Sequence, residues 1–129
     1  WYRSRGLGDV YKRQEFIQVV VNIVNNAVKY SKDGAKILIK AREKMNTSNM
    51  TEYVEISFKD NGIGIAEEHI SRLTERFYRV DSARSKEVGG TGLGLSIVKH
   101  ILNKNMGFID IKSEVGKGSE FLITIPKHA

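Results

Sequence analysis

The sequence predicts an α/β fold: a two-layer sandwich in which helices cover one face of a mixed or antiparallel sheet. Two segments, 15–31 and 93–103, repeat apolar residues at helical spacing. Four short segments alternate apolar and polar residues, as strands with one buried face do. Such strands need a single layer of helices against that face. At 129 residues, the chain is long enough for one domain with its own core.

Residues 1–14 are predicted to lie outside the domain, which then spans 15–129. The stretch from Ser4 to Gln14 resembles the translation of a transposon-type sequencing adapter, and it has neither helical nor strand periodicity. Such fusion scars do not belong in fold reasoning. A genuine basic linker is the alternative.

The formal net charge of +6 suggests a nucleic-acid partner, but the charge distribution speaks against one. Four basic residues and one acidic residue gather in the first 14, and the later charges are interspersed. Basic and aromatic residues do not interleave as on an RNA-stacking sheet. No apolar run approaches a membrane span, and the absence of cysteine suits a reducing cytoplasm. We therefore expect a cytoplasmic domain that contacts neither nucleic acid nor membrane.

The elements are expected in the following order. The first helix, over 15–31, ends in the turn Ser31–Gly34, and a hairpin follows over 36–59, with Ile37, Ile39 and Ala41 on the buried face of its first strand. A second helix is predicted over 66–77 and a Gly-rich lid over 79–92. After the helix over 93–103, two strands centred on 109–111 and 121–125 flank a turn at 115–119.

The first helix carries a polar stripe beside its apolar face. Asn22 and Asn26 lie four residues apart, so their amides project from one face, and Lys29 continues the stripe. Amide oxygens are hard, neutral ligands suited to Mg²⁺, and a lysine can meet a phosphate. A solvated helix face is the alternative, although asparagine is a poor helix former and needs a reason to stand there.

Two glycine-rich segments suggest a nucleotide site. In Asp60-Asn-Gly-Ile-Gly64 the glycines allow a sharp turn, and an aspartate at a strand end can accept a hydrogen bond from the exocyclic amine of adenine. Gly89-Gly-Thr-Gly-Leu-Gly94 runs into a helix, where free N–H groups and the helix dipole favour phosphates. The first segment alone could be an ordinary tight turn and the second a flexible loop.

Together the Asn22–Tyr30, Asp60–Gly64 and Gly89–Leu95 segments resemble the N box and the two glycine boxes of sensor histidine kinases. Phe77-Tyr-Arg79 is similar to their F box, and Ser113–Phe121 to their closing strand pair. The resemblance spans residues 15–127. It implies the Bergerat ATP-binding fold, shared with gyrase, heat-shock chaperone and mismatch-repair ATPases.

The resemblance also implies the ligands, ATP and Mg²⁺, and the residues that hold them. Asn26, helped by Asn22, would ligate the Mg²⁺, and Asp60 would bind the adenine amine. The catalytic set would be Asn22, Lys29, Arg79 and Arg84. The other nucleotide contacts would be Lys29, Tyr30, Gly62, Gly64, Ile65, Phe77, Gly90, Thr91, Gly92, Leu93, Gly94, Leu95 and Ser119.

The resemblance further implies a reaction. Hydrolysing relatives carry a glutamate base four residues before the Mg²⁺ asparagine, where this chain has Asn22, a poor proton acceptor. The γ-phosphoryl would therefore pass to a histidine on a dimerisation domain outside this chain, and a response regulator would act downstream. The parent would be a homodimer, and the resemblance allows for its anchoring in the inner or plasma membrane. An anti-sigma-type serine kinase, or a nucleotide-binding module without catalysis, is the alternative.

Overall fold

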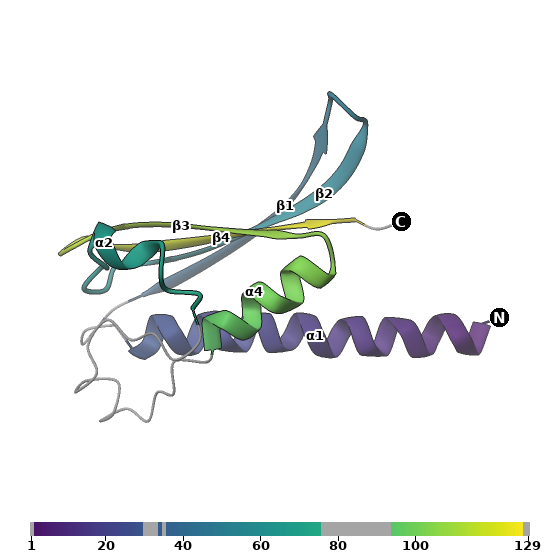
Figure 1. Ribbon diagram of the computed structural model, residues 1–129, viewed down its shortest axis with the longest axis horizontal. Helices are drawn as coiled ribbons and strands as arrows, with labels where there is room; N and C mark the ends of the chain where they lie inside the picture. The colour runs from purple at the N-terminus through teal and green to yellow at the C-terminus, as the bar shows by residue number, and fades with distance from the viewer. Residues whose placement is uncertain (1, 30–33, 35, 76–93, 128–129) are drawn as a thin grey trace.

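The computed structural model describes residues 2–29, 34, 36–75 and 94–127. The described elements follow in the order α1 (Tyr2–Lys29), β1 (Ile37–Asn46), β2 (Thr51–Asp60), α2 (Glu67–Ile70), α4 (Gly94–Lys104), β3 (Phe108–Glu114) and β4 (Gly118–Pro126). α1 and α4 pack together against one face of the sheet, and α2 stands at one end of the strands (Figure 1). The predicted two-layer α/β sandwich is confirmed.

The described strands form one sheet in the order β1-β2-β4-β3. All three strand pairs are antiparallel, so of the two forms that the sequence left open, the described part of the sheet has the antiparallel one. The predicted hairpin over 36–59 and the two later strands are confirmed. The sheet brings β2 and β4 to its centre, where the helices cover them.

The strand register stacks three rows of side chains on the face that the helices cover. Two rows are apolar and the third is polar, each row running from β2 through β4 to β3: Ile56, Ile123 and Ile109; Phe58, Phe121 and Ile111; and Asp60, Ser119 and Ser113. Facing residues on neighbouring strands share one side of a sheet. The apolar core therefore ends at a polar row at the carboxyl end of β2.

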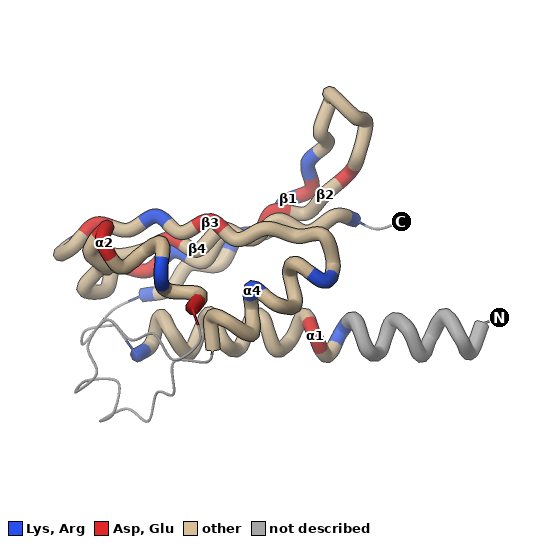
Figure 2. Tube along the Cα trace, viewed as in Figure 1, with Lys and Arg blue, Asp and Glu red and all other residues tan. Residues whose placement is uncertain are grey.

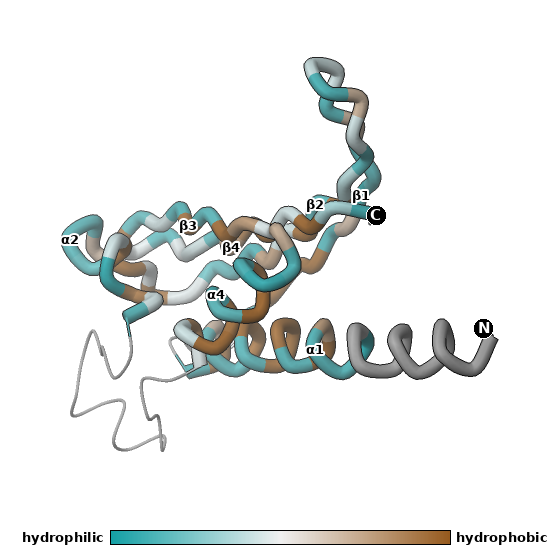
Figure 3. The backbone as a smooth tube through the Cα atoms, turned by 45° about the vertical axis from the view of Figure 1, so that its right-hand side comes forward, coloured by the Kyte–Doolittle hydropathy of each residue, from teal (hydrophilic) through white to brown (hydrophobic). Residues whose placement is uncertain are grey.

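The core fills the space between the two layers. Hydrophobic and hydrophilic stretches alternate along α4 and along the described part of α1, as expected for helices with one buried side (Figure 3). Fully burying one such side chain contributes about 1.5–3 kcal/mol. The largest fully buried side chains come from both layers: Val19, Ile23, Phe58, Val98, Leu102, Phe121 and Ile123.

The prediction of a buried face on the first strand is wrong for most of its length. Ile39 of β1 is 49% exposed and Ala41 is exposed as well, whereas Ile37 is half-buried. β1 is an edge strand. The two long helices pack against each other, α1 also contacts β2, and α4 also contacts β3. The alternating pattern of β1 therefore identified a strand without revealing its distance from the helical layer.

The first helix begins earlier than predicted, whereas its predicted end at residue 31 lies outside the described residues. α1 begins at Tyr2, not at residue 15, and ends at Lys29. Once a packed segment has nucleated a helix, each further residue adds a hydrogen bond at little cost, and no proline interrupts the stretch 2–14. A helical backbone does not depend on an amphipathic pattern along its whole length.

The second helix is shorter than the predicted 66–77. α2 covers only Glu67–Ile70, and a tighter turn follows, in which the N–H of Arg72 donates to the carbonyl of His69 at 3.0 Å. The N–H of Leu73 donates to the carbonyl of Ile70 at 3.4 Å. This change of path turns Leu73 into the core, where it is almost fully buried.

Charges of both signs alternate along the strands (Figure 2). On the outer face, Glu55 bonds to Lys44 at 3.1 Å and to Arg42 at 3.2 Å. The hydrogen bond from Lys44, aided by Arg42, lowers the pKa of the Glu55 carboxyl. None of the helices in the described part of the chain combines the length and the hydrophobicity needed to cross a membrane.

Candidate functional site

The candidate site lies at the end of the molecule where β2 stops and α4 begins (Figure 1). Asp60, the last residue of β2, is 9% exposed. Its Oδ1 accepts a hydrogen bond from the N–H of Gly62 at 2.9 Å, which closes the turn after the strand. Its Oδ2 has no hydrogen-bond partner among the described residues. This oxygen can still accept a hydrogen bond, and its role toward a ligand stays a prediction.

The loop after Asp60 is pressed against the β3–β4 turn. The backbone of Gly64 has φ +77°, and a Cβ there would collide with the carbonyl group of Glu114. Gly118 has φ +127°, and a Cβ there would likewise collide with the carbonyl oxygen of Asp60. The N–H of Gly116 donates to the carbonyl of Ile63 at 2.7 Å. Both segments need glycine because their backbones meet directly.

Ser113 joins the two segments through its side chain. Its Oγ accepts the N–H of Ile65 at 2.7 Å and donates to the carbonyl of Gly118 at 2.9 Å. The hydroxyl of Ser119 lies 2.7 Å from it. Sequence reasoning did not single out Ser113 as a site residue. Its place in the similar closing strand pair was visible, but its partners lie up to 48 residues away along the chain.

The polar stripe of α1 faces the start of α4. Asn22 and Asn26 are half-buried, and neither amide has a hydrogen-bond partner among the described residues. A Cβ on Gly94, the first residue of α4, would lie 3.5 Å from Oδ1 of Asn22. Lys29 is half-buried one turn beyond Asn26. The two helices thus bring two motifs together that stand far apart in the sequence.

The structure places two predicted nucleotide contacts in the core. Ile65 is 3% exposed and Leu95 is 6% exposed, and both belong to the central apolar cluster. Whether they also touch a base or a phosphate stays a prediction. The described residues hold no group of three or more His, Cys, Asp and Glu side chains that could bind a metal.

Several predicted site residues lie outside the described residues, and so does the predicted lid over 79–92. The predictions for them are therefore neither confirmed nor contradicted. They are Tyr30, Phe77, Arg79, Arg84, Gly90, Thr91, Gly92 and Leu93.

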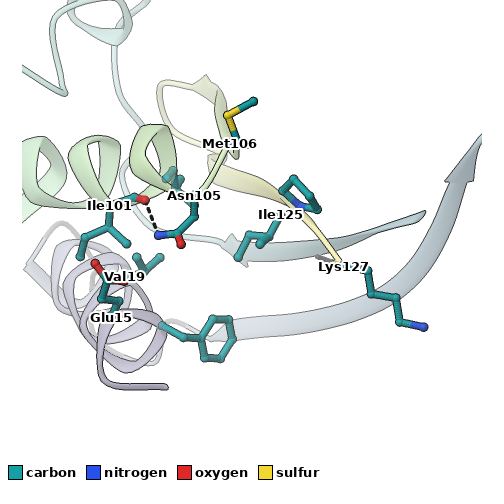
Figure 4. A pocket seen from close by; sticks show the side chains of 10 residues that line it. Glu15, Val19, Ile101, Asn105, Met106, Ile125 and Lys127 are labelled. Atoms are coloured by element: carbon teal, nitrogen blue, oxygen red, sulfur yellow. Dashed lines mark hydrogen bonds between the residues drawn. The ribbon is translucent and has the colours of Figure 1, made fainter. Parts of the chain in front are cut away.

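A separate cavity of about 390 Å³ opens between the middle of α1, the end of α4 and the end of β4 (Figure 4). Its apolar lining includes Val19, Leu102 and Ile125. The ion pair between Lys104 and Glu15, at 3.0 Å, joins the two helices beside it. Ile125 lies at the opposite end of β4 from Ser119, so this cavity is distinct from the candidate nucleotide site.

Replacing Asp60 with alanine is expected to weaken ATP binding about tenfold to a hundredfold, because a hydrogen bond to a charged group contributes about 1.5–3 kcal/mol. Calorimetric titration with ATP measures the loss. Asp110→Ala, which removes an exposed carboxylate from β3, is the matched control. Unchanged affinity in a folded Asp60→Ala protein would refute the adenine role.

Comparison with known proteins gives a consistent result. The family model described as histidine kinase-, DNA gyrase B-, and HSP90-like ATPase matches residues 11–129. Sensor protein SrrB of Staphylococcus aureus is 44% identical over 117 residues, which cover 91% of this chain and 19% of SrrB. The chain therefore spans about a fifth of the curated relatives it matches. The match to the family begins before residue 15, and the origin of residues 1–14 stays a prediction.

Solved structures resemble the chain over most of its length. The catalytic domain of the histidine kinase ThkA, in a nucleotide-free form, has a TM-score of 0.72 and 29% identity and covers 91% of this chain and 70% of that domain. Full-length ShkA in complex with AMPPNP has a TM-score of 0.70 and 28% identity. The match covers 89% of this chain and 22% of ShkA. A mycobacterial sensor histidine kinase, MprB, has a TM-score of 0.73 and 24% identity, and the match covers 89% of this chain and 72% of MprB. At this identity, the match supports the fold alone.

Proposed function

Because the chain belongs to the family of histidine kinase-, DNA gyrase B-, and HSP90-like ATPases, we propose that it is the ATP-binding catalytic domain of a two-component sensor histidine kinase. It transfers the γ-phosphoryl of Mg-ATP to a histidine on a dimerisation domain outside this chain. The observation that carries this proposal is the approach of the start of α4 to the polar stripe of α1, where a Cβ on Gly94 would lie 3.5 Å from the Oδ1 of Asn22. In this proposal, the metal and phosphate groups meet where the two helices approach, and the base lies at Asp60.

The base end of the site follows from the polar row. Asp60 accepts from the exocyclic amine of adenine, while Gly62 and Gly64 let the loop backbone approach the ring. The complex of the related ShkA with AMPPNP supports a nucleotide ligand. Ser119 lies opposite Asp60 in the strand register and faces the same side.

The metal end fits Mg²⁺ by the chemistry of its donors. The amide oxygens of Asn22 and Asn26 are hard ligands that lack hydrogen-bond partners in the described part of the chain. Mg²⁺, when bound, neutralises charge on the β- and γ-phosphates. Lys29 contacts the same phosphates, and Tyr30 lies next to it in sequence. Arg79 and Arg84 supply further positive charge from the lid.

The choice between transfer and hydrolysis depends on Asn22. An amide is a poor proton acceptor, so this position cannot activate a water molecule as a carboxylate could. The domain then acts by positioning the γ-phosphoryl and neutralising its charge until an acceptor histidine docks. The SrrB match supports this role, since that protein is a sensor protein of greater length.

The same proposal fixes the partners. The domain works beside the dimerisation and phosphoacceptor domain of a homodimeric parent in the cytoplasm, and a response regulator receives the phosphoryl group. This chemistry is the same whether or not the parent is anchored in the membrane.

The test is transfer in trans. The 129-residue chain with Mg-ATP is expected to phosphorylate neither itself nor a partner domain whose acceptor histidine is replaced by glutamine. With the intact dimerisation domain, acid-labile and base-stable phosphate should appear on the partner and rise steeply with its concentration. Acid-stable phosphate on a serine would favour an anti-sigma-type kinase instead. ATP binding without transfer to any dimerisation domain would overturn the kinase role.

A further inference from the structure

Three polar side chains cross the sheet side by side at the candidate base site. Asp60 pairs with Ser119 between β2 and β4, and Ser113 pairs with Ser119 between β3 and β4. All three face the helices, directly beyond the row that contains Phe58 and Phe121. Asp60 and Ser119 are buried and Ser113 is half-buried.

The contacts of Ser113 determine where the hydroxyl protons lie. A hydroxyl has one proton to donate and two lone pairs that accept. The carbonyl of Gly118, 2.9 Å from the Ser113 Oγ, only accepts, so the Ser113 proton points there. The N–H of Ile65, at 2.7 Å, only donates and takes one lone pair of Ser113.

One contact of Ser113 remains. The Oγ of Ser119 lies 2.7 Å away, and the Ser113 proton is already used. Ser119 must therefore donate its own proton to the second lone pair of Ser113. This arrangement satisfies all three contacts, whereas the reverse would place two lone pairs against each other at the Gly118 carbonyl.

The consequence is a base site that offers acceptors. Because Ser119 donates its proton to Ser113, it offers only lone pairs to a ligand. A carboxylate such as that of Asp60 also offers only acceptors. A purine with a 6-amino group donates to this pair of residues. A purine with a 6-oxo group would direct its own lone pairs at theirs and leave buried polar atoms unpaired.

We propose that Ser113 sets the preference of this site for 6-aminopurine over 6-oxopurine nucleotides. It does so by fixing the direction in which the hydroxyl proton of Ser119 points. The inference rests on the proposed ATP site and adds its base specificity. Ser113 is a positioning residue, since it acts on the ligand through Ser119.

A purely structural role for Ser113 gives a different expectation. If Ser113 only holds the loop at Ile65, its loss lowers the affinity for every purine nucleotide by the same factor. If it orients the Ser119 proton, its loss frees Ser119 to donate, and a 6-oxo group gains a partner. The ratio of two affinities therefore separates the two roles.

The experiment titrates the full chain with ATP and with ITP, which differ only at the 6 position and the adjoining ring nitrogen. The unaltered chain is expected to prefer ATP by about tenfold to a hundredfold. Ser113→Ala should lower this ratio by about tenfold, and Ser113→Thr, which keeps the hydroxyl, should restore it. Ser57→Ala is the matched control, because Ser57 donates to Glu120 at 2.9 Å on the outer face. It should leave the ratio unchanged.

Equal losses of ATP and ITP affinity in Ser113→Ala would overturn the inference and leave the proposed function standing. If circular dichroism shows that Ser113→Ala does not fold, Ser119→Ala answers the same question, because it removes the acceptor itself and should also lower the ratio. An unchanged ratio in that variant overturns the inference. Failure of the unaltered chain to bind either nucleotide would refute the proposed function first.

Discussion

Gly64→Ala is expected to weaken ATP binding by at least about a hundredfold, which corresponds to about 2.7 kcal/mol. The added Cβ would collide with the Glu114 carbonyl and come within 2.9 Å of Cα of Val115. The left-handed backbone, at φ +77°, adds about 1–2 kcal/mol of strain for alanine. The loop would have to leave the β3–β4 turn, and the bond between Ile65 and Ser113 would break.

Two other glycines separate strain from collision. Gly34 has the same φ of +77° and Gly116 has φ +86°, but a Cβ at either position would meet no atom within 4 Å. Gly34→Ala and Gly116→Ala should therefore lose some stability and retain most of the ATP affinity. Calorimetry gives the affinities and thermal unfolding gives the stabilities. A Gly64→Ala protein that binds ATP as tightly as Gly116→Ala would contradict the role of close backbone contact.

Asn26→Ala is expected to reduce the affinity for Mg-ATP by about a hundredfold and to leave that for metal-free ADP within a few-fold. Loss of groups that merely support metal ligands already costs about 10- to 100-fold, so loss of a direct ligand should cost no less. The amide of Asn26 is half-buried and has no hydrogen-bond partner among the described residues, so its removal should hardly affect folding.

The neighbouring Asn25→Ala is the matched control, since Asn25 is an exposed residue of the same type on the same helix. Titrations with Mg-ATP, and with ADP in the presence of EDTA, supply the comparison. Equal losses for both ligands in Asn26→Ala would show that Asn26 is structural and not a metal ligand.

The sequence was a good guide to local structure. The alternation of Ile56 and Phe58, and of Phe121 and Ile123, predicted strands correctly because a side-chain period of two is written into the strand itself. The apolar spacing over 93–103 located α4 within one residue at each end. Asn22 and Asn26 could be placed on one helix face for the same reason.

Other features depended on which elements become neighbours. The pattern of Ile39 and Ala41 could not show that β1 is an edge strand with its inner face largely exposed. Nor could the helical periodicity of the sequence show that α1 begins as early as Tyr2 or that α2 ends at Ile70. Helix ends are set by packing and by competing turns, which leave a weak trace in periodicity.

For this protein, the sequence by itself determined the fold class, the family and most of the proposed ligand groups, since these depend on residue types at short spacing. The tertiary structure alone decided that Ser113, Ser119 and Asp60 form one row and that Gly94 lies against Asn22. Strand order and register join residues that are far apart in the chain, and the direction of a hydroxyl proton depends on the atoms that surround it in space.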